Sequence, residues 1–94
     1  MNEPNDTDSL IAQAELGKDA REFLEGDLGK CLLGFARQEV ELAKEKLCTV
    51  KAGDIEAVQA LQNEAALGVR FERWLVELVQ EGDDAIKVLK QQQE

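Results

Sequence analysis

The sequence contains no histidine, no tyrosine and a single serine, Ser9, at the predicted start of a helix. Histidine is the most frequent general base in enzymes, and a serine nucleophile needs such a base beside it. The lack of these side chains argues against acid–base and nucleophilic catalysis. We therefore expect a protein that is not an enzyme, with no catalytic residue and no cofactor.

Cysteine is also scarce, with only Cys31 and Cys48 in the chain. Both are predicted to lie on one helix, where their 17-residue separation corresponds to about 25 Å. That distance is far beyond disulfide reach. We expect reduced, semi-buried thiols, with an intermolecular bridge through Cys48 as the alternative. Two distant cysteines without histidine do not form a zinc site.

Acidic side chains offer the remaining possibility of a metal site. Glu77, Glu81 and Asp84 lie on one helical face and could bind a hard cation weakly. Acidic residues at this spacing are more typical of a solvated surface. We expect no metal site.

Proline occurs once, at Pro4, and β-branched residues never alternate with polar ones over the length of a strand. This composition predicts an all-α fold, and a length of 94 residues predicts a single domain. We place the helical domain at residues 7–90, between a flexible tail at residues 1–6 and a frayed C-terminus at residues 91–94.

No apolar run reaches the roughly 20 residues of a transmembrane helix. The N-terminus lacks the basic and apolar regions of a secretory signal. We expect an intracellular protein. The net charge of −9 argues against direct binding to nucleic acid or to an anionic membrane.

The longest helical pattern runs from residue 54 to about residue 89. Asp54 is a suitable N-cap, and apolar residues follow in two adjacent stripes, forming a face wider than the ~100° of an ordinary surface helix. Gly82 could end this helix, but it lies in phase with the apolar residues, so we predict one continuous helix. Phe71 and Leu75 are predicted core residues, with truncation to alanine costing about 2–5 kcal/mol each.

Two shorter helices precede this long one. The first is predicted to begin at a Thr7 or Asp8 cap and to end at Gly26 as a C′ glycine. The second follows at once, with Asp27 as its cap, and ends near Val50.

Three glycines lie inside these two helices. Gly17 is predicted to bend the first helix. Gly29 and Gly34 are costly in a helix, and we expect close approach by another helix to compensate for them, with the third helix near Gly68 or Gly82 as the candidate.

The turn at residues 51–54 is so short that the second and third helices must be antiparallel neighbours. The sequence thus predicts a three-helix arrangement, an antiparallel hairpin with a long C-terminal helix and a shorter N-terminal helix packed on it. The third helix is longer than the second and should extend past it, with the first helix covering part of this extension.

The candidate partner-binding residues all lie on the third helix. Two arginines beside a tryptophan could form a recognition patch through cation–π contacts, although a core tryptophan covered by the arginine stems is the simpler interpretation. Two aliphatic residues continue the apolar stripe past the second helix, where exposed apolar surface usually marks an interface. These five residues are Arg70, Arg73, Trp74, Ile86 and Leu89. We expect a homo-oligomer, most simply a two-fold dimer, or a tight complex with a larger protein.

Several segments resemble a family of small, acidic, all-helical proteins encoded among the head and packaging genes of tailed bacteriophages. They are Ala-Leu-Gln-Asn-Glu at residues 60–64, Phe-Glu-Arg-Trp-Leu at residues 71–75, Ala-Glu-Leu-Gly at residues 14–17, Phe-Leu at residues 23–24 and Leu-Gly at residues 28–29. The resemblance covers most of residues 10–86. It implies a role in virion assembly or host interaction, in the host cytoplasm or the virion, and it transfers no site residue.

The sequence therefore favours a non-enzymatic protein–protein interaction or assembly protein, most simply a bacteriophage virion-assembly or structural accessory protein. The alternative is an acidic inhibitor that mimics nucleic acid on a host nuclease or polymerase. Salt separates the two hypotheses, because binding by a polyanion mimic weakens steeply as ionic strength rises.

Overall fold

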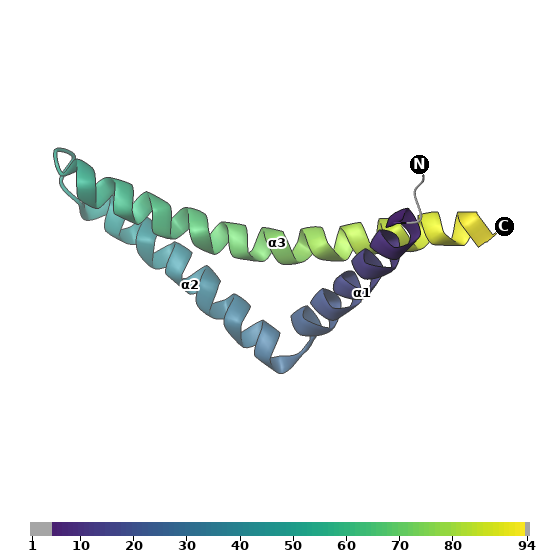
Figure 1. The fold of residues 1–94 in the computed structure, drawn as a ribbon. Coiled ribbons are helices and arrows are strands. Elements are labelled where there is room, and N and C mark those ends of the chain that lie inside the picture. Colours follow the sequence, from purple (N-terminus) through teal and green to yellow (C-terminus); the bar gives the residue numbers. More distant parts are fainter. Residues whose placement is uncertain (1–4, 94) are drawn as a thin grey trace.

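The computed structural model describes residues 5–93, and within that range it consists of three α-helices and no strand. They are α1 (Asn5–Glu25), α2 (Asp27–Thr49) and α3 (Ile55–Gln93). Helices α1 and α2 form the two arms of a V, and α3 runs from the end of one arm to the end of the other (Figure 1). This arrangement confirms the predicted antiparallel hairpin with a shorter N-terminal helix packed on a long C-terminal one.

The two ends of the helical domain differ slightly from the prediction. Helix α1 already includes Asn5, before the predicted caps at Thr7 and Asp8, and α3 continues to Gln93. The predicted tail at residues 1–6 falls mainly on residues 1–4, which lie outside the described part of the chain, as does Glu94.

Helix α3 is continuous through Gly82, as predicted, and its 39 residues correspond to a length of about 58 Å. The predicted cap at its start is also confirmed, because the backbone N–H of Ala57 donates to Asp54 Oδ1 at 3.1 Å. A carboxylate in this position satisfies one of the free N–H groups of the first turn. The Asp54 cap explains why α3 begins at Ile55. The apolar residues that continue at helical spacing on both sides of Gly82 explain why α3 does not end there.

The joint between α1 and α2 is a single residue, Gly26. Its backbone is extended, with φ −84° and ψ 165°, and it is itself the N-cap of α2. The predicted end of the first helix at Gly26 is confirmed. The predicted capping role of Asp27 is wrong, because Gly26 is the N-cap and Asp27 is already inside α2. One residue is enough for the joint because Gly26 takes part in both helices. Its N–H donates to the Glu22 carbonyl at 3.0 Å, and its carbonyl accepts from the Lys30 N–H at 3.0 Å.

Gly29 makes this tight joint possible, because a Cβ at Gly29 would overlap the carbonyl oxygen of Phe23 at the end of α1. The predicted close approach of another helix at Gly29 is thus confirmed, although that helix is α1 and not the suggested α3. A Cβ at Gly34 would meet nothing within 4 Å, so no close approach accounts for Gly34.

Helices α1 and α3 cross in close contact at Gly17 and Gly82. A Cβ added at Gly17 would lie 2.7 Å from Gly82 Cα and 2.8 Å from the carbonyl oxygen of Leu78. A Cβ at Gly82 would in turn lie 2.7 Å from Gly17 Cα and 3.0 Å from the Gln13 carbonyl oxygen. Only hydrogen side chains allow this backbone-to-backbone contact. Gly17 is therefore a contact residue for α3, in place of the bend predicted for it.

Helices α2 and α3 approach closely at a second point, around Gly68. A Cβ there would lie 2.5 Å from Val40 Cγ2 and 3.0 Å from the Ala36 carbonyl oxygen. Val40 and Ala43 of α2 are buried in this seam. The predicted role of Gly68 as a place of close approach to α2 is thus confirmed, although the residues it meets are Ala36 and Val40.

The buried apolar residues are small. Among the described residues they are Ala20, Val40, Ala43 and Ala85, and no large side chain is fully buried. Phe71 and Leu75 are partly buried, and the predicted cost of truncating them to alanine stays a prediction. Each helix pair buries its own seam, and the three helices do not surround a common core.

The dimensions of the molecule agree with this pairwise packing. Its radius of gyration is 18.9 Å, whereas a compact domain of this length has a value of about 12 Å. Its principal extents are 61 × 35 × 14 Å, so its thinnest direction spans only about two packed helix backbones. The chain is a flat plate with both broad faces exposed.

Both cysteines lie on α2, and their thiols are free and exposed. The expected lack of a disulfide between Cys31 and Cys48 is confirmed, although the thiols are more accessible than predicted. None of the three described helices is both long enough and apolar enough to cross a membrane.

Candidate partner-binding surface

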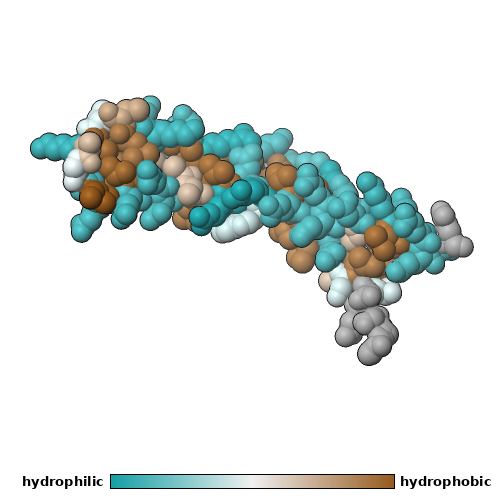
Figure 2. Space-filling model, turned by 90° about the horizontal axis from the view of Figure 1, so that it is seen from above, coloured by the Kyte–Doolittle hydropathy of each residue, from teal (hydrophilic) through white to brown (hydrophobic). Residues whose placement is uncertain are grey.

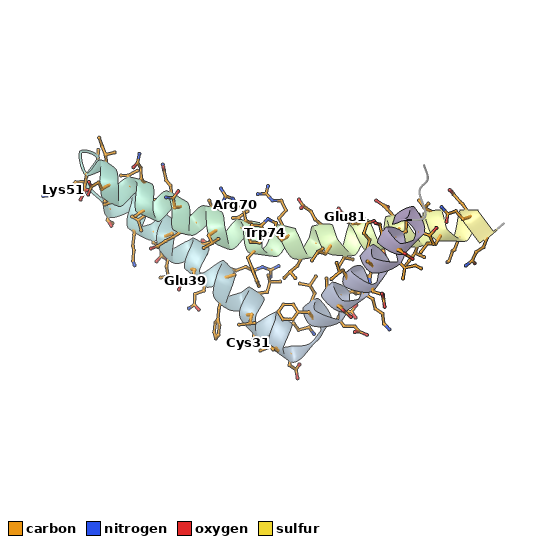
Figure 3. The ribbon with its side chains drawn as sticks, in the orientation of Figure 1. Cys31, Glu39, Lys51, Arg70, Trp74 and Glu81 are labelled. Atoms are coloured by element: carbon orange, nitrogen blue, oxygen red, sulfur yellow. The ribbon has the colours of Figure 1, made fainter. Side chains whose placement is uncertain are left out.

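The middle of α3 carries Trp74, which is 51% exposed and is therefore not a core residue. Figure 3 places Trp74 and Arg70 on this stretch of α3 and Cys31 near the joint between α1 and α2. Trp74 lines a groove together with Leu67 and Phe71 of α3 and with Leu32 of α2. The groove is the place where apolar side chains from both helices of the hairpin come together on one face.

The apolar surface extends from this groove along α2. Leu28 and Phe35 lie four residues before and three residues after Leu32, which places all three on the same side of the helix. Leu28 is 66% exposed and Phe35 is 58% exposed. We call this surface the α2–α3 patch, and its residues are Leu28, Leu32, Phe35, Leu67, Phe71 and Trp74.

The two arginines predicted to accompany Trp74 have separate positions. Arg73 lines a second groove with Val40, Val69 and Val76, which shares only Gly68 with the groove at Trp74. Arg70 is exposed and lines neither groove. Arg73 thus lines a different groove from Trp74, whereas Arg70 lies one turn before Trp74 on α3.

Ile86 and Leu89 belong to a third groove, at the crossing of α1 and α3. They line it together with Ile11 and Ala14 of α1. Ile86 remains 39% exposed, and Leu89 is half-buried. Because α1 crosses α3 at Gly82, this end of α3 is partly covered, and the five predicted partner-binding residues divide between separate surfaces.

Two ion pairs bridge the helices, and sequence reasoning missed both. Arg21 of α1 donates through Nη2 to Asp83 Oδ1 and Oδ2 at 3.0 and 2.8 Å. Arg37 of α2 donates through Nε and Nη2 to Glu72 Oε1 and Oε2 at 3.0 and 2.8 Å. One pair therefore links each short helix to α3, beside the glycine contact that the same helix makes.

The pair at Glu72 had a signal in the sequence, because Glu72 is the one charged residue within the apolar stripe of α3. The structure explains it. The hydrogen bond with Arg37 is the main cause that lowers the pKa of the Glu72 carboxyl from its ordinary value, and burial opposes this only partly. The same hydrogen bond raises the pKa of the Arg37 guanidinium.

Acid should weaken the contact between α2 and α3. Because the folded-state pKa of Glu72 is lowered, its contribution to stability is present above the ordinary carboxyl pKa and is lost as pH falls through the lowered value. Glu72→Gln should therefore lose less stability than the unmodified chain between about pH 5 and pH 3. The effect should be small, since the pair is solvent-exposed.

Urea midpoints at several pH values measure this difference. Glu77→Gln is the matched control, because Glu77 is exposed on α3 and its replacement should leave the acid dependence as it is in the unmodified chain. Equal acid dependence in Glu72→Gln and Glu77→Gln would show that the ion pair does not contribute.

Within the described residues, no cluster of three acidic or cysteine side chains is placed to hold a metal ion, and this includes Glu77, Glu81 and Asp84. Comparison of the chain with protein-family models, with curated proteins and with solved structures gave no match. The exposed apolar side chains are therefore the main indication of function.

Proposed function

We propose that this protein is a non-enzymatic interaction or assembly protein that binds protein partners through the α2–α3 patch. The observation that carries the proposal is the number and size of its exposed apolar side chains. Thirteen large ones are exposed among the described residues, whereas the buried ones are three alanines and a valine. Apolar patches interrupt the hydrophilic surface along the length of the molecule (Figure 2).

Single exposed leucines are normal on protein surfaces and need no explanation. The α2–α3 patch differs because four of its side chains, Leu32, Leu67, Phe71 and Trp74, come from two helices and line one groove. Leu28 and Phe35 extend it along the side of α2 that carries Leu32. Contiguous apolar surface of this kind usually marks an interface, and an exposed aromatic anchor such as Trp74 is typical of the residues that dominate binding energy.

The resemblance of residues 10–86 to small acidic proteins of tailed bacteriophages suggests what is assembled. We propose a role in virion assembly or as a structural accessory protein, in the host cytoplasm or the virion. An elongated plate with apolar side chains on its broad faces suits a component that is held between larger protein subunits.

Affinity purification from the source organism, followed by quantitative mass spectrometry, tests this function. A tagged unmodified chain should recover specific proteins, and virion proteins if the assembly role is right. Phe35→Asp combined with Leu67→Asp should lose them, while the matched control, Leu16→Asp combined with Val69→Asp, should retain them. All four side chains are more than half exposed, so each double variant adds two charges without disturbing a buried seam.

Salt distinguishes this function from the alternative, an acidic mimic of nucleic acid. Binding through an apolar patch should change little between low salt and about 0.5 M salt, whereas a polyanion mimic should lose affinity steeply. Recovery of a nuclease or polymerase that is released by salt and is insensitive to Phe35→Asp and Leu67→Asp would contradict the proposal and support the mimic.

A further inference from the structure

We infer that the α2–α3 patch is covered by a second copy of this chain, in a two-fold symmetric dimer whose hairpins pack face to face. This inference rests on the proposed function and identifies a second copy of the chain as the partner that binds the patch. The surface in question consists of Leu28, Leu32, Phe35, Leu67, Phe71 and Trp74, as defined above.

The chain exposes more surface than a compact monomer of its size. Its accessible surface is 7087 Å², whereas a folded monomer of its mass, 10.4 kDa, is expected to expose about 5,400 Å². The excess of roughly 1,700 Å² is about twice the ~800 Å² that each partner contributes to an interface of standard size. One chain thus exposes the surplus that a stable, extensive homodimer would bury.

The three helices do not enclose a common core. A stable domain needs at least two packed layers around such a core, but each short helix here packs mainly against its own part of α3, and α1 and α2 contact each other chiefly at their joint. No large side chain is fully buried in the described part of the chain. A second hairpin laid over the α2–α3 patch would supply the missing layer, and Trp74, Phe71 and Phe35 of both copies would then form its core.

Charged side chains of both signs lie beside the patch. A net charge of −9 makes two copies repel at long range. Glu39 and Glu64, however, line the groove, and Arg70 lies one turn before Trp74 on α3. In a two-fold contact the same surface meets itself, so acidic side chains of one copy can pair with basic ones of the other.

Sedimentation equilibrium with purified chains tests the inference. The unmodified chain should have twice its 10.4 kDa mass at about 100 μM, a protein level at which micromolar complexes are formed. Phe35→Asp combined with Leu67→Asp should weaken the dimer by more than about 100-fold, as expected when two central interface residues are lost. Leu16→Asp combined with Val69→Asp, which adds the same charge elsewhere, should remain dimeric.

A monomeric unmodified chain at high micromolar concentration would overturn the inference, as would a patch variant that stays dimeric or a control variant that dissociates equally. Because dimers of this kind often have no stable folded monomer, the patch variant can also unfold. Cysteine substitution then decides the question.

For this second measurement, Leu67→Cys and, separately, Leu16→Cys are placed in a chain whose Cys31 and Cys48 are both serine. Maleimide should modify position 67 more slowly at 100 μM than after dilution to nanomolar concentration, and position 16 at the same rate in both. Equal behaviour at the two positions would overturn the inference.

The two proposals can fail separately. If the unmodified chain is monomeric and still recovers partners through the patch, the second copy is wrong and a foreign protein occupies the surface. If the chain is a dimer through the patch but recovers no other protein, the dimer stands and the wider assembly role fails.

Discussion

Gly82→Ala is expected to destabilise the protein by about 1–3 kcal/mol, the usual range for overpacking a tight contact. Helix propensity alone predicts the opposite sign, because alanine favours a helix interior by about 1 kcal/mol over glycine. The crossing overrides propensity, since the new Cβ would lie 2.7 Å from Gly17 Cα and 3.0 Å from the Gln13 carbonyl oxygen. Both neighbours are backbone atoms and cannot move aside without shifting α1.

Gly34→Ala is the matched control, because it makes the same substitution inside a helix where a Cβ meets nothing within 4 Å. This variant should gain up to about 1 kcal/mol. Thermal or urea unfolding followed by circular dichroism measures both changes. If the two variants shift stability in the same direction, α1 does not cross α3 at Gly82.

The second large effect is expected from Ala43→Leu in the seam between α2 and α3. Ala43 is only 1% exposed, and a leucine there would force the helices apart close to the Gly68 contact. We expect a loss of about 1–3 kcal/mol, accompanied by weakening of the Arg37–Glu72 pair, whose bidentate geometry requires the present helix spacing.

Ala12→Leu provides the comparison for this prediction, because Ala12 is exposed on α1. Its stability should stay within about 0.5 kcal/mol of the unmodified chain, as is usual for surface substitutions. Denaturant midpoints distinguish the two variants. An Ala43→Leu chain as stable as Ala12→Leu would mean that α2 does not pack on α3 through this residue.

Local signals in the sequence predicted the helices well. The Asp54 cap and the apolar phase that includes Gly82 are both short-range features, and both led to the correct start and continuity of α3. The short turn before Asp54 likewise required an antiparallel hairpin. Each of these conclusions depends on residues within a few positions of one another.

Contacts between distant parts of the chain could not be predicted in this way. Arg21 and Asp83 are 62 positions apart, and no local pattern pairs them. Gly17 and Gly82 are each uninformative alone, because a helical glycine can equally be a bend, a helix end or a contact. Their pairing follows only from the angle between α1 and α2, which the extended backbone of Gly26 determines.

The candidate surface shows a related limit. Periodicity correctly indicated that α3 has a wide apolar face, but it does not say which part of that face another helix covers. Trp74 fits a core position by its phase and is nevertheless half-exposed, whereas Ala85 on the same helix is 2% exposed. The wide face was predicted, but within one chain each part of it packs against only one short helix.

Fluorescence of Trp74, the single tryptophan of the chain, tests most directly whether the apolar face is covered by association. At about 100 μM, emission should be shifted to the blue and protected from iodide, relative to the Phe35→Asp and Leu67→Asp double variant, because an aromatic ring buried in an interface is shielded from water. Dilution should move the unmodified chain toward the variant. An emission maximum and an iodide sensitivity equal to those of the variant at 100 μM would contradict burial of this face.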